Sequence, residues 1–291
     1  MAIRLNGSGR LLWVFGVLSL AAVATGGFVC ARSGVPTGVW LRNLAAWGVG
    51  ALVAGGVARG VRAGAVPVAL LAAPLGLLAA LWGPAQEGVH RWLKLGPLHI
   101  NVAMLLLPSA VVALAVLGRD RRWPWSVAFI ALTLLLLQPD ASQATALGAC
   151  LGLLAACAAW PVAIRGALVA VAGVLTAATW LRPDPLQPVA EVEEVIGLAY
   201  AVSPLAAGLA VILLAAVVAA PVVATRSAPP APRLAGGALS LCFLLWVTTP
   251  LLGAFPVPWV GIGMSPILGA WLGVGLLAAL LRRPAPLSQP G

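Results

Sequence analysis

Most of the carboxylates of this chain lie in one short stretch. Four of its seven acidic residues, Asp184, Glu191, Glu193 and Glu194, fall within RPDPLQPVAEVEEVIG, residues 182–197. Carboxylates that lie near one another raise the pKa of at least one member of the group. Such a group suits a general base or a site for a divalent cation. The stretch is therefore a candidate for chemistry.

A second candidate combines cations with an aromatic ring. The segment GPAQEGVHRWLKLGPLHIN, residues 83–101, contains Arg91, Trp92 and Lys94. A guanidinium, an ammonium and an indole suit a phosphate that carries a sugar. The alternative is an anchor in the headgroup zone, where Trp and Arg are both common. His90 and His99 lack cysteine partners, and we interpret them as polar rim residues.

A third candidate is LLLLQPDASQATAL, residues 134–147. Pro139 stops the preceding helix, and Asp140 follows at the start of the next apolar run. Asp140 is typical of an N-cap, whose carboxylate accepts the first free amides of a helix. Such a bent helix end can also shape the wall of a cavity.

The last candidate, TTPLLGAFPVPWVGIGMSP, spans residues 248–266. Two prolines and three glycines within residues 253–263 prevent a continuous helix. We expect a re-entrant or loop segment at membrane depth, which is tolerated where it is buried in protein or lines a cavity.

Composition indicates which elements position these residues. Charged residues make up 8% of the chain and hydrophobic ones 62%, whereas soluble domains are roughly 25% charged. Runs of about 17–25 apolar residues cross a bilayer as helices. The sequence therefore predicts an all-α, polytopic membrane protein, one domain over residues 1–291 with about ten transmembrane helices. The spans lie at about 11–31, 44–63, 66–83, 99–117, 124–138, 142–164, 166–181, 195–224, 234–252 and 266–281.

The first span resembles a signal peptide in its basic start, but it is long for one and lacks a convincing cleavage site. The excess of 17 basic over 7 acidic residues indicates topology rather than nucleic-acid binding, because no basic stretch has interleaved aromatics. The four cysteines show no metal-ligand spacing, so they predict no metal site.

With both termini in the cytoplasm, most basic residues lie inside, as is usual. The inner ones are Arg4, Arg10, Arg59, Arg62, Arg119, Arg121, Arg122, Arg165, Arg226, Arg233, Arg282 and Arg283. Every acidic residue except Asp120 then lies outside. The candidate residues are thus predicted to face the outer side of the membrane.

These segments resemble motifs of the SEDS family (shape, elongation, division and sporulation), the RodA- and FtsW-like peptidoglycan glycosyltransferases. GVHRWLKLGPL resembles G-x-R-R-W-[IL]-x-[IL]-G, LQPDASQA resembles Q-P-D-x-G-T-A, and PVPWVGIGMS resembles P-L-P-F-[VI]-S-Y-G-G-S. The matching residues are Gly88, Arg91, Trp92, Leu93, Leu95 and Gly96, then Gln138, Pro139, Asp140 and Ala144, then Pro256, Pro258, Val260, Gly263 and Ser265. The motifs follow the family's order and ten-span layout, so the resemblance covers nearly the whole chain.

The chain also departs from the family. Residues 101–104, Asn-Val-Ala-Met, replace the family's Q-P-S-E, and the large outer loop before span eight is reduced to the acidic stretch. In the family that loop ends in P-x-x-x-T-D-F with a catalytic Asp. Counted from Pro188, Glu193 takes the place of this Asp. In another register the family's later E-E falls on Glu193 and Glu194, and no catalytic acid is matched.

The resemblance implies polymerisation of lipid II, the undecaprenyl-pyrophosphate-linked disaccharide peptide, on the outer face of the bacterial cytoplasmic membrane, in division or elongation. A carboxylate takes the proton of the attacking hydroxyl, and Glu193 is the candidate, with Glu191 and Glu194 as substitutes. Arg91 and Lys94 are candidates to steady the pyrophosphate. The resemblance also implies substrate contacts by Trp92, Gln138, Asp140 and Ser265, a class B penicillin-binding protein as partner, and a groove between spans for the lipid tails. No cofactor is implied with certainty, and a divalent cation is compatible.

Two other classes remain open at the level of sequence. A degenerate family member that binds lipid or acts as a scaffold in a cell-wall complex is favoured by the lost Q-P-S-E and the short loop. A small-molecule transporter needs charged residues inside the spans, and these are nearly absent.

Overall fold

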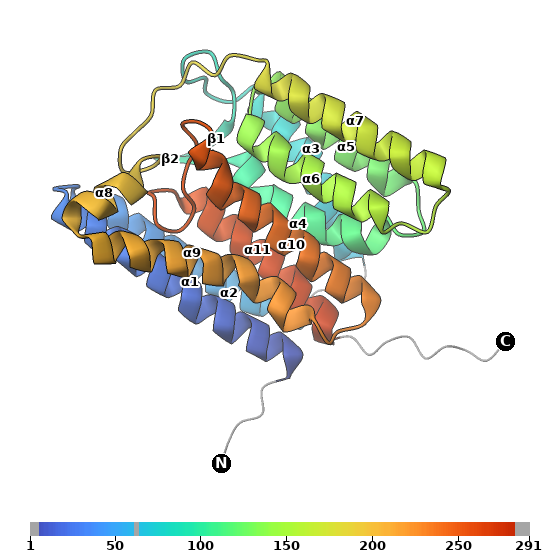
Figure 1. Ribbon diagram of the computed structural model, residues 1–291, viewed down its shortest axis with the longest axis horizontal. Coiled ribbons are helices and arrows are strands. Elements are labelled where there is room, and N and C mark those ends of the chain that lie inside the picture. Colours follow the sequence, from blue (N-terminus) through green and yellow to red (C-terminus); the bar gives the residue numbers. More distant parts are fainter. Residues whose placement is uncertain (1–5, 61–63, 283–291) are drawn as a thin grey trace.

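The protein is a bundle of long apolar helices (Figure 1). The computed structural model describes residues 6–60 and 64–282. Within this part, six helices are long and apolar enough to cross a membrane, namely α1 (Gly7–Arg32), α2 (Thr37–Gly60), α7 (Val162–Trp180), α9 (Pro204–Thr225), α10 (Pro230–Thr248) and α11 (Met264–Arg282). Four apolar helices are shorter, namely α3 (Ala65–Ala80), α4 (Val102–Leu117), α5 (Trp123–Leu137) and α6 (Ala141–Ala156). The expected all-α, polytopic membrane fold is confirmed.

The eighth expected span is interrupted. Residues 195–224 were predicted as one helix, but the short α8 (Val195–Val202) ends before α9 begins at Pro204. A proline disfavours helical backbone at the residue before it, and Ser203 is extended, with φ −171° and ψ 134°. The Ser203 side chain caps α9 by accepting the Leu205 amide at 3.2 Å. The apolar composition of this run concealed the break.

A small hairpin joins α3 to α4. Strands β1 (Trp92–Leu95) and β2 (Leu98–Asn101) pair antiparallel, with Trp92 opposite Asn101. Gly96 begins the two-residue turn with φ +60°, a conformation that glycine adopts without steric cost. No strand was predicted here, because each strand has only four residues and leaves little periodicity in the sequence.

Helix α11 lies between α2 and α4 at very close range. A Cβ on Gly275 would lie 2.8 Å from the Cα of Ala54 in α2. A Cβ on Gly269 would overlap the carbonyl oxygen of Met104 in α4. Small residues let membrane helices approach closely and gain dispersion contacts. Glycine is therefore the residue that fits at both positions.

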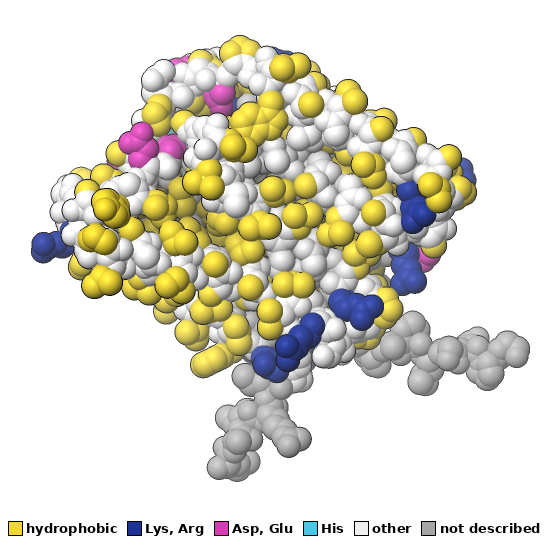
Figure 2. Space-filling model, in the orientation of Figure 1, with side chains coloured by type: hydrophobic (Ala, Val, Ile, Leu, Met, Phe, Trp, Pro, Cys, Tyr) yellow, Lys and Arg dark blue, Asp and Glu magenta, His cyan; other side chains and the backbone are white. Residues whose placement is uncertain are grey.

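The charges separate towards the two ends of the bundle. Figure 2 shows the acidic side chains gathered mainly at the upper left, and several Lys and Arg side chains at the lower right. The end that carries the hairpin, the 181–194 loop and α8 is called the acidic end below (Figure 1). Arg4, Arg62 and Arg283 lie outside the described residues. Which end faces the cytoplasm stays a prediction.

Candidate functional site

A cavity of about 280 Å³ lies among the segments singled out by sequence. Its wall includes Arg91 and Trp92 at the hairpin, Asp140 before α6, and Glu193 in the loop before α8. Ser265, in the first turn of α11, completes this set. Two of the shorter helices begin at the cavity, because Asn101 and Asp140 are the N-caps of α4 and α6. The cavity thus joins segments that lie far apart in the chain.

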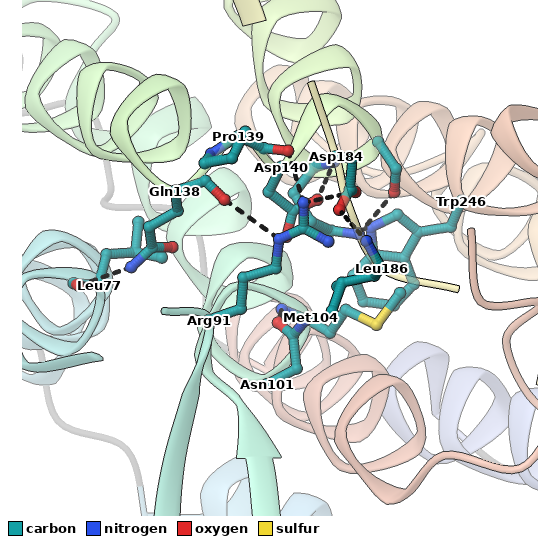
Figure 3. A network of polar contacts seen from close by, with 12 residues as sticks. Leu77, Arg91, Asn101, Met104, Gln138, Pro139, Asp140, Asp184, Leu186 and Trp246 are labelled. Atoms are coloured by element: carbon teal, nitrogen blue, oxygen red, sulfur yellow. Dashed lines mark hydrogen bonds and ion pairs between the residues drawn. The ribbon is translucent and has the colours of Figure 1, made fainter. Parts of the chain in front are cut away.

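Arg91 is held from two sides (Figure 3). Its Nε donates to the carbonyl oxygen of Gln138 at 3.2 Å, and its Nη2 donates to that of Pro139. The Asp184 Oδ2 accepts from Nη2 at 2.6 Å, while the Asp140 Oδ2 lies 3.8 Å from Nε. Only 8% of the Arg91 side chain is exposed. A buried charge requires such partners, so this guanidinium fixes the hairpin to the α5–α6 corner.

Asp140 caps α6, and the predicted N-cap is confirmed. Its Oδ1 accepts the Gln143 amide at 3.3 Å. Burial raises the pKa of the Asp140 carboxyl, and the Arg91 guanidinium acts in the opposite direction. Nearby, Gln138 does not line the cavity; its Nε2 donates to the Leu77 carbonyl at 2.8 Å. Gln138 therefore connects the end of α5 to α3.

Glu193 lies where two cavities meet. It lines the polar cavity and also an apolar cavity of about 510 Å³ formed by α8, α9 and α10. Its Oε2 accepts the Val189 amide at 2.7 Å within the same loop. Burial raises the pKa of the Glu193 carboxyl, and the nearby carboxylates of Glu191 and Glu194 raise it further, against the Val189 hydrogen bond. A raised pKa suits a general base, which works best with a pKa near the operating pH.

The other two acids of the loop are placed differently. Glu194 lines only the apolar cavity, and Glu191 lines neither of the two. The backbone of Glu191 has another role, since its carbonyl oxygen accepts the Ile262 amide at 2.9 Å. Of the three candidate bases, Glu193 alone borders the cavity that Arg91 and Ser265 share.

The segment between α10 and α11 supports this loop. Its irregular part, residues 252–263, is called the re-entrant segment below. Two backbone hydrogen bonds connect it to the 181–194 loop. One of them runs from the Val257 amide to the Val192 carbonyl at 3.0 Å. Trp259 is fully buried with φ +62°, a strained conformation that persists only where the surroundings fix it. The expectation of irregular backbone at this position is confirmed.

Asn43 of α2 holds the re-entrant segment from the other side. Its Nδ2 donates to the Gly261 carbonyl at 2.9 Å, and its Oδ1 accepts the Gly263 amide at 3.1 Å. The residue is only 4% exposed. Asn43 was not predicted as a site residue, although a lone amide beside an apolar span signals a polar contact between helices.

Comparison with known proteins identifies the architecture. No family model and no curated protein matches the chain. The structure of the rod shape determining protein RodA of Thermus thermophilus matches with a TM-score of 0.72 and 21% identity, over 93% of this chain and 96% of that one. A point mutant of the same protein gives a TM-score of 0.73 at 21% identity, over 93% and 97%. The chain has the RodA fold.

A third solved structure has this fold as well. It is described as showing the structural coordination of polymerization and crosslinking by a peptidoglycan synthase complex, and it matches with a TM-score of 0.64 and 20% identity, over 93% of this chain and 97% of that one. The RodA-like fold confirms the SEDS-like architecture that the sequence motifs implied.

Within the RodA-like fold, the cavity gathers some of the predicted residues and not others. Arg91, Trp92, Asp140, Glu193 and Ser265 line it together. Lys94 lies on β1 opposite His99, is exposed, and does not line the cavity. The Ser265 Oγ also accepts a hydrogen bond from the Asn101 backbone amide at 2.9 Å. Among the described residues, no group of three His, Cys, Asp or Glu side chains is arranged to hold a metal ion.

Proposed function

We propose that the protein is a SEDS-family peptidoglycan glycosyltransferase that polymerises lipid II. One observation carries the proposal: a carboxylate with a raised pKa borders both a polar cavity and an apolar one. A lipid-linked sugar has both characters, since its headgroup is polar and its chain is hydrocarbon. The RodA fold, found over 93% of the chain, supports this assignment.

In the proposed reaction, a sugar hydroxyl of one lipid II attacks the anomeric carbon of another. Glu193 takes the hydroxyl proton as the new glycosidic bond forms. The bond from the anomeric carbon to the pyrophosphate breaks, and undecaprenyl pyrophosphate leaves with the bonding electron pair. Arg91 lines the polar cavity, where its guanidinium stabilises the negative charge that develops on the leaving group. The apolar cavity between α8, α9 and α10 receives part of a lipid chain.

The proposal includes a location and a partner. The acidic end faces the outer side of the bacterial cytoplasmic membrane, and both termini lie in the cytoplasm. The solved peptidoglycan synthase complex supports the proposal of a class B penicillin-binding protein beside this chain. Such a transpeptidase crosslinks the strands that this protein makes.

A non-enzymatic scaffold is the second candidate function. The observation in its favour is that two carboxylates, Asp140 and Asp184, already balance the Arg91 charge. A lipid-binding subunit of a cell-wall complex needs no free cation at this point. The two functions differ in one measurable result, the formation of glycan strands.

The test is strand synthesis from lipid II by purified protein together with its transpeptidase partner. Glu193→Gln keeps the size of the side chain but cannot accept the proton, so polymerisation should fall by about 10²–10⁴-fold. Glu193→Asp keeps the carboxylate and should retain measurable activity. Glu87→Gln is the matched control, because Glu87 is exposed and lines neither cavity. Parental rates in Glu193→Gln would remove Glu193 as the base, and an inactive parent would favour the scaffold.

A further inference from the structure

Asp184 makes a long-range contact that the proposed mechanism does not use. It lies 93 positions after Arg91 in the chain, yet its Oδ2 is 2.6 Å from the Arg91 Nη2. Figure 3 shows the two side chains pointing at each other beside Asp140. Arg91 is itself immobilised, because it donates to the carbonyls of Gln138 and Pro139 and is nearly buried. Asp184 is thus bound to a fixed point of the structure.

The segment around Asp184 has few other attachments. Residues 182–190 are called the strap below. They form no helix or strand, a turn begins at Ala190, and most of their side chains are exposed. Within the described residues, the other hydrogen bonds of the strap stay local, between positions 179 and 194. The ion pair with Arg91 is the one polar side-chain contact found there between the strap and a distant segment.

The strap nevertheless forms part of the site. Leu186, Gln187 and Val189 line the polar cavity, and the Val189 amide donates to the carboxylate of Glu193. The backbone carbonyl of Val189 also accepts the Glu193 amide at 3.0 Å. Any displacement of the strap therefore moves the groups that hold Glu193. A charge-assisted hydrogen bond is about twice as strong as a neutral one, and Asp184 supplies such a bond near the start of the strap.

We infer that Asp184 is a positioning residue, whose ion pair with Arg91 holds the strap against the polar cavity and thereby fixes Glu193 relative to that cavity. The inference deepens the proposed function and rests on it for the role of Glu193. The tether itself does not rest on that function, because it is a contact within the protein.

The first test follows the strap without any substrate. Amide hydrogen exchange in detergent-purified full-length protein reports on Val189, whose amide donates to the Glu193 carboxylate. Asp184→Asn removes the charge at constant size, and exchange of the Val189 amide should accelerate at least tenfold while exchange in α6 stays unchanged. Asp184→Glu should restore slow exchange. Glu87→Gln, a change at an exposed acid in the same end of the molecule, should leave the strap as in the parent. Unchanged exchange in Asp184→Asn would overturn the tether.

The second test separates positioning from plain stability. A misplacement of about 1 Å can lower a rate roughly 100-fold, so Asp184→Asn should lower kcat at least tenfold with a smaller change in KM. A loosened strap also admits water to Glu193, so the inflection of kcat with pH should move down towards the ordinary glutamate value. A lowered melting temperature with unchanged kcat and unchanged pH profile would show a structural role only, and would refute positioning. If the parent makes no strands, the proposed function fails, and hydrogen exchange still decides the tether.

Discussion

Glu193 combines a polar and an apolar environment in one side chain. It borders both cavities, and its carboxylate is hydrogen-bonded only within its own loop among the described residues. Burial disfavours the charged form and raises the carboxyl pKa, and the neighbouring acids act in the same direction. The protonation state of this one residue therefore changes at a higher pH than that of an ordinary glutamate.

This shift predicts the pH dependence of the reaction. Because a general base must be deprotonated, polymerisation should rise as pH increases through the raised pKa of Glu193 and then level off. The folded state binds this proton more tightly than the unfolded one, so the group stabilises the fold below its unfolded pKa, and this contribution is lost as pH rises through the folded pKa. Rates measured from acid to neutral pH should show the inflection in the parent and not in the residual activity of Glu193→Gln. The same inflection in both proteins would assign it to another group.

At the scale of elements, the re-entrant segment depends on a helix that is remote in sequence. Asn43→Leu removes both hydrogen bonds to Gly261 and Gly263 and leaves their polar atoms without these partners. Each unsatisfied buried group costs about 1–3 kcal/mol, so the melting temperature in detergent should fall clearly, and strand synthesis with it. Thr133→Val is the matched control, because the exposed Thr133 hydroxyl bonds only to its own helix. A parental melting temperature in Asn43→Leu would show that the segment is held by packing alone.

Small residues let membrane helices approach closely, and the glycines of α9 and α10 differ in what surrounds them. A Cβ on Gly236 would meet the Thr225 hydroxyl of α9, so Gly236 serves the contact between α9 and α10. Gly208 on α9 has open space around it. Gly208→Leu should therefore reduce co-purification of a class B penicillin-binding protein several-fold without unfolding this protein. Gly173→Leu, at an equally open position of α7, should not, and equal losses in both variants would count against α9 as the contact.

The apolar runs of the sequence predicted most of the helices. The contacts between those helices were harder to predict. Each run is long enough to be recognised from composition alone, and its ends are marked by Pro, Gly or charged residues. The break at Ser203 was missed because α8 and α9 are equally apolar. The contact between Arg91 and Asp184 spans 93 positions, and no local pattern encodes such a distance. Trp92, Asp140 and Ser265 could be grouped in advance only through the motif resemblance.

At the scale of the whole molecule, the separation of charge predicts the orientation in the membrane. Gln187→Cys at the acidic end should react with an impermeant thiol reagent added to intact cells. Ser227→Cys, in the turn between α9 and α10, should react only after the membrane is opened. Cys157 is the exposed cysteine among the described residues, so both changes are made together with Cys157→Ser. Labelling of Ser227→Cys from outside would invert the proposed topology and move the site to the cytoplasmic face.

The close packing of α11 has a consequence for biogenesis. This helix leaves the ribosome after α2 and α4, yet its glycines occupy the space directly beside their backbones. Until α11 is inserted, the faces of α2 and α4 that it covers are open to lipid. The re-entrant segment leads directly into α11, so during this interval its C-terminal end is not yet anchored by that helix. Assembly of the polar cavity therefore waits for α11, and a nascent chain released before α11 carries every candidate catalytic carboxylate without a finished site around them.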